Sequence, residues 1–256
     1  MKLSIIIPAY NEEKNIEATL RKLLQGLDKT LTYPYEIIVI SDGSTDRTVQ
    51  SARKIKSPKV KVLEYSKNHG KGYALTFGVK NSKSEIVTFF DAGGDFPPDL
   101  IDKFIKLLEV FDADIVIGSK RHPASVVNYP LKRRFYSRLY QLLIRLLFNL
   151  NIRDTQTGLK VFKRKVLEKI LPRALIKQYA FDLELLVIAR QLGYRKIFEA
   201  PVRMNYNFQT SNIGFQTIFN ILCDTAAIFY RAKILRYYGQ PHIKIVKQKV
   251  DNRAIK

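Results

Sequence analysis

The sequence predicts an α/β protein with an open, mostly parallel sheet and helices on both faces. Short runs of β-branched residues alternate with amphipathic segments through the first half of the chain, which is typical of repeated strand–helix–strand units. The 256 residues are 46% hydrophobic, which is enough for one large core. Polar motifs directly follow several of the apolar runs, as expected where parallel strands end at a binding site.

The expected elements alternate along the first half of the chain. The strands are expected at Leu3–Ile7, Glu36–Ile40, Lys61–Glu64, Ile86–Phe90 and Asp114–Ile117, and the helices between them at 12–26, 45–55, 71–81 and 98–110. Beyond about residue 120 the pattern becomes mainly helical, with segments at 135–149, 163–171, 181–192 and 215–236.

The segment 135–149 carries more apolar residues than a helix on a soluble core needs. Its polar residues form one narrow stripe, which consists of Arg138, Gln141, Arg145 and Asn149. This excess indicates either deep burial or a position in a membrane interface, with basic residues at its edge. No stretch of roughly 18 residues is both apolar and uncharged, so no transmembrane helix is expected.

The chain is strongly and unevenly basic. Its 44 lysine and arginine residues against 23 acidic residues give a net charge of +21. No acidic residue occurs between Ile115 and Arg153 or between Thr225 and Val250. This asymmetry indicates a nucleic acid, an anionic membrane surface or a phosphorylated substrate as partner, or else a solvated basic face. The single cysteine, Cys223, excludes an internal disulfide and fits a reducing compartment.

Three polar motifs stand at the carboxyl ends of expected strands. They are "PAYNEE" from residue 8, "SDGSTD" from residue 41 and "DAGGD" from residue 91. Because parallel strands bind ligands at this edge, the three motifs are expected to form one site. A further stretch, "NHGKGYA" from residue 68, places two glycines and Lys71 before a helix, where amides and an ammonium can meet a phosphate.

In this order and context the motifs resemble a known family. "SIIIPAYNEE", "IIVISDGSTDRT", "NHGKGYALTFGV" and "FFDAGGDFPPDL" resemble the nucleotide-sugar half of an inverting family 2 glycosyltransferase with the GT-A fold. "VIGSKR", "DTQTGLKVFKR" and "YAFDLELLVIARQLGYRKIFEAPVRMNY" are similar to the branch that transfers sugars to polyprenyl phosphates, and look closest to dolichyl-phosphate glucosyltransferases. We therefore expect a nucleotide-sugar half at 1–120, an acceptor and membrane-interface half of the same domain at 121–238, and a basic tail at 239–256.

The resemblance implies roles on the donor side. Pro8, Tyr10, Glu12 and Asp42 would hold the nucleoside, Lys71 and Gly72 would border the nucleotide, and Asp91, Ala92 and Gly93 would lie at the nucleotide sugar. The family pattern Asp-x-Asp has Asp91 in its first place and Gly93 in its second, and Asp95 follows two residues later. Because Mg²⁺ and Mn²⁺ accept one or two carboxylates together with phosphate oxygens and water, Asp91 and Asp95 suffice in number. The alternative is that Asp95 only caps the next helix.

The same resemblance implies an acceptor side in the basic half. Arg121, Arg134 and Ser137 would hold the acceptor phosphate, with Lys120 and Arg133 as neighbours and Asp154 and Gln156 lining the pocket. Alternatively, the arginines only face anionic lipid headgroups. In "FDLE", one of Asp182 and Glu184 would orient the sugar or a basic residue, and the other would cap a helix. Relatives carry a cation in a following loop, where this chain has Asn212.

Together these features predict a hexosyltransferase. We expect inverting transfer from a nucleotide sugar, UDP-glucose first and GDP-mannose second, to a dolichyl-type polyprenyl phosphate, with Mg²⁺ or Mn²⁺ as cofactor. A phosphate monoester is largely ionised at neutral pH, so it needs positioning cations rather than a strong base. Attachment is expected to be peripheral, at the cytoplasmic face of an anionic membrane. The alternatives are a hydroxyl acceptor, with Asp182 or Glu184 as base, and remotely a nucleic-acid binder; no nucleic acid is expected as partner.

Overall fold

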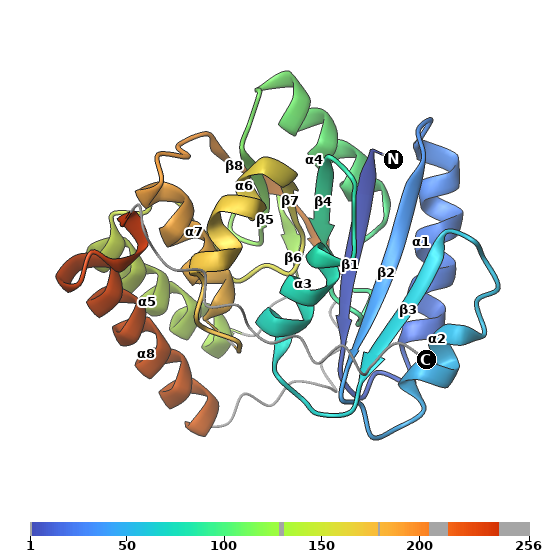
Figure 1. The fold of residues 1–256 in the computed structure, drawn as a ribbon. Coiled ribbons are helices and arrows are strands. Elements are labelled where there is room, and N and C mark those ends of the chain that lie inside the picture. The colour runs from blue at the N-terminus through green and yellow to red at the C-terminus, as the bar shows by residue number, and fades with distance from the viewer. Residues whose placement is uncertain (1, 128–130, 179, 205–214, 241–256) are drawn as a thin grey trace.

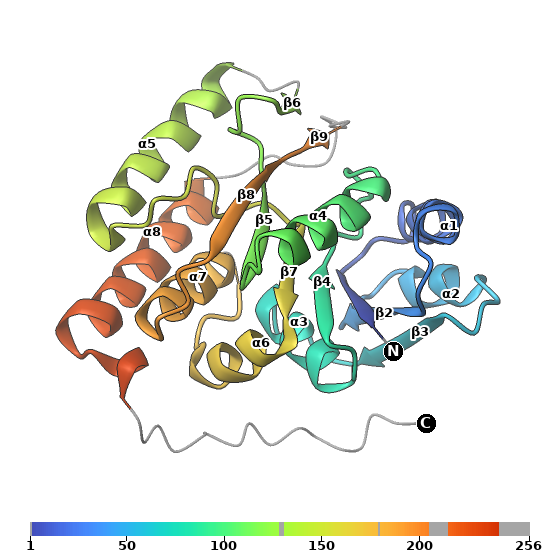
Figure 2. The same ribbon diagram turned by 90° about the horizontal axis from the view of Figure 1, so that it is seen from above.

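The computed structural model describes residues 2–127, 131–178, 180–204 and 215–240, and within these ranges the side chains of 131–135 and 215 are not described (Figure 1). A central sheet crosses the molecule, and helices pack against both of its faces (Figure 1 and Figure 2). This arrangement confirms the predicted α/β class. The tail expected at 239–256 lies outside the described residues beyond Gln240.

Seven strands form the central sheet. They are β1 (Leu3–Ala9), β2 (Tyr35–Asp42), β3 (Val60–Tyr65), β4 (Ile86–Phe89), β5 (Ile115–Ser119), β7 (Lys160–Lys163) and β8 (Ile197–Pro201), in the spatial order β3-β2-β1-β4-β7-β5-β8. All neighbours are parallel except β7, which runs antiparallel to β4 and β5. A separate pairing joins β6 (Val126–Val127) to β9 (Arg203–Met204). The carboxyl ends of β1, β2 and β4 therefore share one edge.

The strands are buried because alternate side chains enter two different cores. In β1, Ile5 and Ile7 enter one core and Ile6 enters the other, as the two-residue period of a strand requires. One core lies beneath α1 (Ile16–Thr30), α2 (Thr48–Arg53) and α4 (Asp99–Val110). The other lies beneath α3 (Lys71–Lys80), α5 (Leu131–Phe148), α6 (Arg164–Ile170), α7 (Phe181–Gln191) and α8 (Phe215–Phe229), and α8 continues as a π-helical turn at Tyr230–Ile234. Single 3₁₀ turns occur at Leu171–Arg173 and Tyr237–Gly239.

Two helices begin later than their periodicity predicts. The helix expected from residue 12 begins at Ile16, because Asn11 has a left-handed backbone with φ of 55° and the next residues form a turn. The helix expected at 45–55 is reduced to Thr48–Arg53, because the Asp46 carboxylate accepts the Thr48 N–H at 2.9 Å and ends the preceding loop. Both changes leave polar side chains in loops at the edge of the sheet.

The pattern of the sequence predicts neither β7 nor β8. Lys160 and Lys163 interrupt the apolar run of β7, and Glu199 and Pro201 interrupt that of β8. Tertiary pairing decides both strands, since β7 fills the gap between β4 and β5 and β8 completes the outer edge. The proline is tolerated because it lies at the end of an edge strand.

Helices α5 and α8 lie side by side in both views (Figure 1 and Figure 2). Tyr140 and Thr225 share a hydrogen bond of 2.9 Å between their hydroxyl oxygens, and the rings of Phe148 and Phe229 lie 6.2 Å apart. The two helices therefore form one unit, although they are separated by most of the second half of the chain.

The outward side of this unit is apolar. The large exposed apolar side chains on α5 are Tyr136, Leu139, Leu142 and Leu146. Those on α8, its π-helical turn and the residue that follows it are Ile218, Phe219, Leu222, Tyr230, Ile234 and Leu235. Within the polar stripe, Arg138 and Arg145 are exposed, whereas Gln141 is only 7% exposed and donates to Thr155. The exposed leucines on α5 exclude deep burial of the whole helix. Within the described residues, no helix combines the length and the apolarity needed to cross a membrane.

Candidate active site

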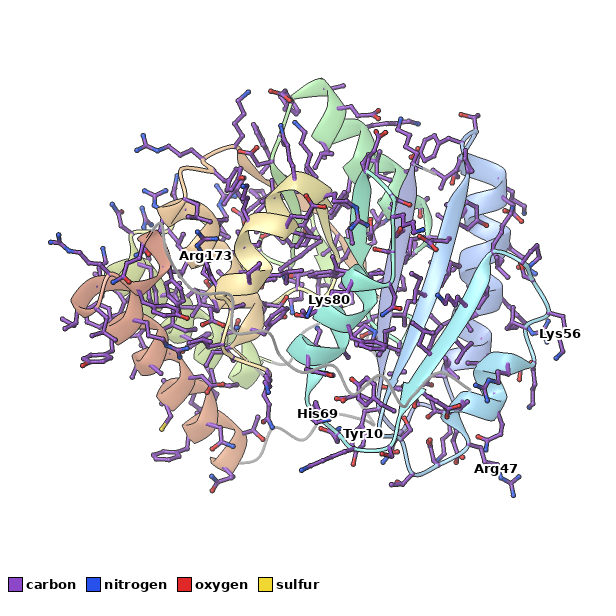
Figure 3. All side chains as sticks on the ribbon, in the orientation of Figure 1. Tyr10, Arg47, Lys56, His69, Lys80 and Arg173 are labelled. Atoms are coloured by element: carbon purple, nitrogen blue, oxygen red, sulfur yellow. The ribbon has the colours of Figure 1, made fainter. Side chains whose placement is uncertain are left out.

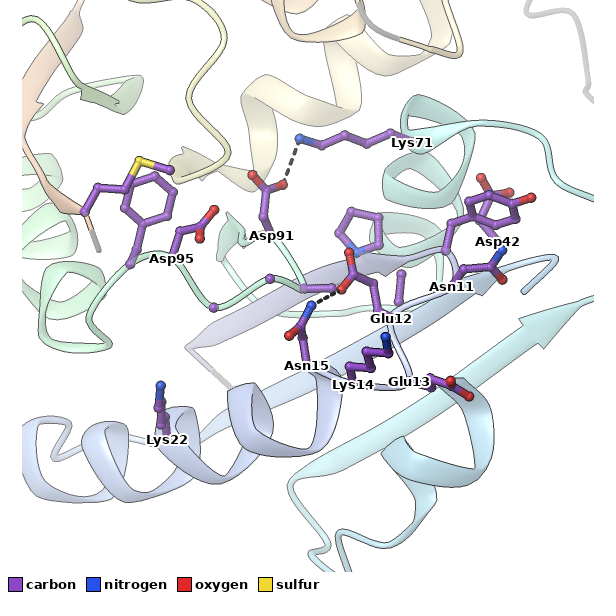
Figure 4. A pocket seen from close by; sticks show the side chains of 18 of the residues that line it. Asn11, Glu12, Glu13, Lys14, Asn15, Lys22, Asp42, Lys71, Asp91 and Asp95 are labelled. Carbon is purple, nitrogen blue, oxygen red and sulfur yellow. Dashed lines mark hydrogen bonds and ion pairs between the residues drawn. The ribbon is translucent and has the colours of Figure 1, made fainter. Parts of the chain in front are cut away.

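A large cleft opens where β1, β2 and β4 end. Its volume is about 2150 Å³. Its lining includes Pro8, Tyr10, Glu12, Asp42, Lys71, Asp91, Ala92, Gly93, Asp95, Gln156 and Asp182. Figure 4 shows Glu12, Asp91 and Asp95 around one space, with Lys71 reaching toward Asp91 from α3. The strand-end motifs therefore form one site, as their order predicts.

The loops that follow β1 and β2 are joined by side-chain hydrogen bonds. The Thr45 N–H donates to Asn11 Oδ1 at 2.9 Å, and the Glu13 N–H donates to Asp46 Oδ2 at 3.1 Å. Each loop thus supplies acceptors for the other's backbone. Tyr10, which follows β1 directly, is half-exposed and lines the cleft.

Asp42 organises the loop that precedes α3. Its buried carboxylate accepts hydrogen bonds of 2.8 Å from the Tyr65 hydroxyl, the His69 N–H and the Gly70 N–H. A carboxylate offers about four acceptor positions, so roughly one remains for a ligand. Figure 3 labels Tyr10 and His69 at the same end of the sheet.

Asp91 and Asp95 bracket a tight turn after β4. The Gly94 N–H donates to the Asp91 carbonyl oxygen at 3.3 Å, and Gly94 has a φ of 69°, which favours glycine. A Cβ at Gly94 would also lie 2.5 Å from Thr19 Oγ1, so α1 can approach only a glycine here. The turn brings both carboxylates to the cleft (Figure 4).

Negative charge accumulates around this turn. Burial raises the pKa of Asp95, and the Asp91 carboxylate adds to this shift while Lys120 opposes it. Burial likewise raises the pKa of Glu12 against a hydrogen bond from Asn15, and Asp91 and Asp95 raise it further.

A divalent cation fits this charge and these oxygen donors. Asp91 and Asp95 offer hard carboxylate oxygens, the ligand type that Mg²⁺ and Mn²⁺ prefer. No cluster of three His, Cys, Asp or Glu side chains suited to a metal occurs among the described residues. The other ligands would therefore come from substrate oxygens and water, as is usual for Mg²⁺ beside phosphates.

Lys71 balances part of the negative charge. Its Nζ lies 2.8 Å from Asp91 Oδ1 and 3.7 Å from Asp182 Oδ2. Burial alone would lower the pKa of Lys71, but the two carboxylates outweigh it and raise that pKa. The other oxygen of Asp91 faces Gly158, where a Cβ would come within 1.6 Å of it. The last residue of the "DTQTG" motif, Gly158, therefore lies against the Asp91 carboxylate, and a side chain at this position would collide with it.

A smaller and more cationic pocket lies beside the cleft. Its volume is about 470 Å³, and its lining includes Lys120, Arg121, His122, Ser137, Arg138 and Asp154. Arg121 donates to Ser137 Oγ at 2.8 Å. Asp154 accepts the backbone N–H of Lys120 at 3.0 Å and that of Gln156 at 3.1 Å. Because Gln156 lines the larger cleft, residues 154–156 connect the two pockets.

Two residues of the predicted site lie elsewhere. Gly72 is buried in the first turn of α3 and donates its N–H to the Lys177 carbonyl at 2.8 Å. Glu184 is fully buried in α7, and its carboxylate accepts from Leu175 N–H, Ile176 N–H, Arg231 and Tyr238. Glu184 does not line the cleft, and its carboxylate is engaged by donors away from it. Its expected catalytic role stays a prediction. The side chains of Arg133 and Arg134, and all of Asn212, lie outside the described residues.

Several residues at or beside the site were not named in the predicted site, among them Asp46, Gln178 and Lys160. Asp46 has a detectable signal, because it is the last residue of "SDGSTD". Gln178 lines the cleft from the loop before α7. Lys160 is fully buried beside Asp182. Nothing in the sequence indicates this burial, since a lysine in a short apolar segment is normally expected to be exposed.

The comparison with protein families agrees with this geometry. The model of the family described as glycosyl transferase family 2 matches residues 4–171, more than half of the chain. The chain belongs to glycosyl transferase family 2. The resemblance drawn from the strand-end motifs is thereby confirmed, and the matched residues include all three motifs.

Curated family 2 relatives show which branch the chain is similar to. The dolichyl-phosphate beta-glucosyltransferase of Drosophila melanogaster is 36% identical over 210 residues, which cover 75% of this chain and 64% of the relative. The human protein of the same name is 32% identical over 220 residues, covering 80% of this chain and 67% of the relative. This family 2 chain therefore spans about two thirds of the length of these relatives.

Solved structures agree on the fold. Glucosyl-3-phosphoglycerate synthase from Mycobacterium tuberculosis, in complex with Mn²⁺, UDP and phosphoglyceric acid, superposes with a TM-score of 0.68 at 20% identity. The match covers 94% of this chain and 80% of that protein. It confirms the GT-A fold expected of a family 2 member.

Proposed function

We propose that this protein transfers glucose, with inversion, from UDP-glucose to a dolichyl-type polyprenyl phosphate. The observation that carries the proposal is a cationic pocket of Lys120, Arg121 and Ser137 directly beside a cleft that contains Asp91 and Asp95. Such a pair of sites fits an anionic acceptor next to a nucleotide diphosphate. The names of the relatives in Drosophila melanogaster and humans support the same acceptor and sugar. GDP-mannose is the second donor to test.

On the donor side, the nucleoside would lie between the loops after β1 and β2. Pro8 and Tyr10 supply apolar and aromatic surface there, and Asp42 has an acceptor position left for a base N–H. Asp91 and Asp95 would hold Mg²⁺ or Mn²⁺. A cation bound there would neutralise negative charge on the diphosphate leaving group. Lys71 provides a second positive charge in the cleft.

On the acceptor side, the cationic pocket positions an ionised phosphate. Arg121 and Ser137, already joined at 2.8 Å, present donors to the phosphate oxygens, and Lys120 adds charge. By resemblance to the family, Arg133 and Arg134 of α5 complete this set. The second pKa of a phosphate monoester is about 6, so the nucleophile arrives largely deprotonated and the site needs no general base.

The alternative of a hydroxyl acceptor needs such a base, and the two candidate carboxylates are poorly suited to it. Lys160 and Lys71 outweigh burial and lower the pKa of Asp182. A lowered pKa weakens a carboxylate as a proton acceptor. Glu184 is enclosed by its four donors and does not line the cleft.

The unit of α5 and α8 would hold the protein at the cytoplasmic face of an anionic membrane. Its exposed leucine and phenylalanine side chains can enter the interface, and Arg138 and Arg145 on α5 are exposed to lipid headgroups. Because Arg121 bonds to Ser137 of α5, the acceptor pocket adjoins this surface. The lipid tail could then remain in the bilayer while its phosphate enters the pocket.

A partition assay tests the proposed reaction. Purified protein with Mg²⁺ or Mn²⁺ and dolichyl phosphate is given labelled UDP-glucose or GDP-mannose, and the label in the organic phase is counted. We expect label from UDP-glucose, and its loss in Asp91→Asn but not in Val110→Ala, an exposed change on α4. Release of free UDP without lipid-borne label would instead indicate a hydroxyl acceptor or hydrolysis.

A further inference from the structure

Lys160 lies in the middle of the central sheet, where charged side chains are rarely found. It belongs to β7, its neighbours across the sheet are Phe89 of β4 and Ile117 of β5, and its exposure is 0%. Its ammonium donates to Asp182 Oδ1 at 2.7 Å and to the carbonyl oxygen of Thr157. Lysine is almost never fully buried without a partner, so this ion pair requires an explanation.

The ion pair continues into the cleft. The second oxygen of Asp182 lies 3.7 Å from Lys71 Nζ, and Lys71 Nζ lies 2.8 Å from Asp91 Oδ1. Charges therefore alternate from the core to the open site, in the order Lys160, Asp182, Lys71 and Asp91. Asp182 links the two ends, because it is 7% exposed and still lines the cleft.

The protonation states agree with this arrangement. Burial would raise the pKa of Asp182, but Lys160 and Lys71 outweigh it and lower that pKa. Burial lowers the pKa of Lys160, and the carboxylate of Asp182 opposes the shift. Asp182 is therefore a carboxylate at neutral pH and can hold the Lys71 ammonium electrostatically.

Lys71 needs such an anchor because its nearer partner has another role. Lys71 is one-third exposed and its long side chain can turn toward solvent. If Asp91 is engaged by a cation, the 2.8 Å contact with Lys71 is lost or weakened. Asp182 remains available, since its position is set from the core by Lys160.

We propose that the buried pair of Lys160 and Asp182 is a positioning device that keeps the Lys71 ammonium in the cleft, facing the diphosphate of the nucleotide sugar. This inference depends on the donor assigned under Proposed function. Lys160 acts through Asp182 and Asp182 through Lys71, so both are positioning residues. The competing explanation is that the pair only fills the core.

Removing both charges separates positioning from packing. Lys160→Met alone leaves a buried carboxylate with less compensation and should lower the melting temperature, whereas Lys160→Met/Asp182→Leu replaces the pair by apolar groups and should largely restore it. Binding of UDP-glucose in the presence of Mn²⁺, measured by calorimetry without acceptor, should remain weaker by on the order of tenfold in the double variant. If binding recovers together with the melting temperature, the pair only fills the core and the proposal is overturned.

A second test leaves Lys160 in place, in case the first variants do not fold. Asp182→Asn is compared in the wild-type and the Lys71→Met backgrounds. We expect Asp182→Asn to weaken UDP-glucose binding on the order of tenfold in the first background and to have little effect in the second, because its effect passes through Lys71. Equal losses in both backgrounds would overturn the proposal. If wild-type protein does not bind UDP-glucose with Mn²⁺ at all, the proposed function fails as well, which distinguishes the two failures.

Discussion

At the scale of single residues, Asp91 shows how the site is prepared before any ligand arrives. One carboxylate oxygen is held by Lys71 at 2.8 Å, and the other faces the backbone at Gly158. The Asp91 side chain therefore has little freedom to leave the cleft. Such preorganisation matters because a charge stabiliser that is already in place need not be reorganised during the reaction.

Gly158→Ala tests how closely this carboxylate must be placed. The added Cβ would lie 1.6 Å from Asp91 Oδ2. The Asp91 carboxylate must therefore move, whereas the backbone of either residue need not. We expect kcat/KM for UDP-glucose to fall on the order of a hundredfold, with a small change in melting temperature. Gly239→Ala is the matched control, since a Cβ there has no atom within 4 Å. Full activity in Gly158→Ala would show that Asp91 tolerates displacement.

The lowered pKa of Asp182 predicts that the free energy of unfolding depends on pH. Its pKa lies below the ordinary 3.8 in the folded protein, because Lys160 and Lys71 outweigh burial. Its contribution to the free energy of unfolding is therefore complete above that ordinary value and is lost as the pH falls through the folded value. Urea unfolding should show a gap between wild type and Asp182→Asn that is largest at neutral pH and shrinks in acid. A gap that stays constant would mean that Asp182 is not ionised in its pair.

At the scale of elements, Glu184 connects the segment that follows α8 to the loop before α7, next to α3. Its carboxylate accepts from Arg231 and Tyr238, which follow α8, and from the backbone N–H groups of Leu175 and Ile176. That loop continues to Lys177, whose carbonyl accepts an N–H from the first turn of α3. One buried side chain thus fixes the relation between three elements.

Glu184→Ala should consequently destabilise the fold rather than the chemistry. It leaves Arg231, Tyr238 and two amides without their acceptor, and losing one member of a buried charged network typically costs about 3 kcal/mol or more. We expect this loss in the free energy of unfolding measured with urea. Glu168→Ala, at an exposed position of α6, should stay within about 0.5 kcal/mol. A Glu184→Ala protein of normal stability and no activity would instead support a catalytic role.

The apolar surface of α5 and α8 makes a separate prediction. Leu142→Asp/Leu146→Asp places two charges where bilayer contact is proposed, on side chains that are already more than half exposed. Binding to vesicles that contain anionic lipid should weaken by about tenfold or more, because burial of each leucine contributes about 1.5–3 kcal/mol. The melting temperature should change little. Val110→Asp, on α4, is the control for added charge on an exposed apolar position. Unchanged flotation of the double variant would contradict this docking surface.

At the scale of the whole molecule, the net charge is +21, but acidic and basic side chains gather at two different sites. The cleft contains the carboxylates of Asp91 and Asp95, whereas the adjoining pocket contains Lys120 and Arg121. Opposite charges are thus placed where a cation and an anionic acceptor are proposed to bind. The remaining basic residues repel one another and favour anionic surfaces.

Salt should therefore act in opposite directions on two measurements. Screening reduces self-repulsion, so the melting temperature should rise as sodium chloride is added. The same screening should weaken binding to anionic vesicles, because headgroup attraction to exposed basic residues is electrostatic. Vesicle binding that does not respond to salt would indicate that apolar contacts alone hold the protein there.

The sequence by itself determined the strands whose ends line the cleft, the order of their motifs and the family. Buried parallel strands leave short apolar runs, and each motif follows its strand directly, so local patterns are sufficient for β1, β2 and β4. The pattern of the sequence alone places Asp42, Asp91 and Asp95 at one edge of the sheet, because parallel strands end together.

Only the tertiary structure decided the features that depend on distant partners. β7 becomes a strand because β4 and β5 leave a place between them, and Lys160 is buried because Asp182 compensates its charge. Gln141 is buried and donates to Thr155, and Glu184 lies away from the cleft, where Arg231 and Tyr238 donate to it. A lysine, a glutamine or a glutamate has the same local signal in water and in a core, so only its partners decide where it lies.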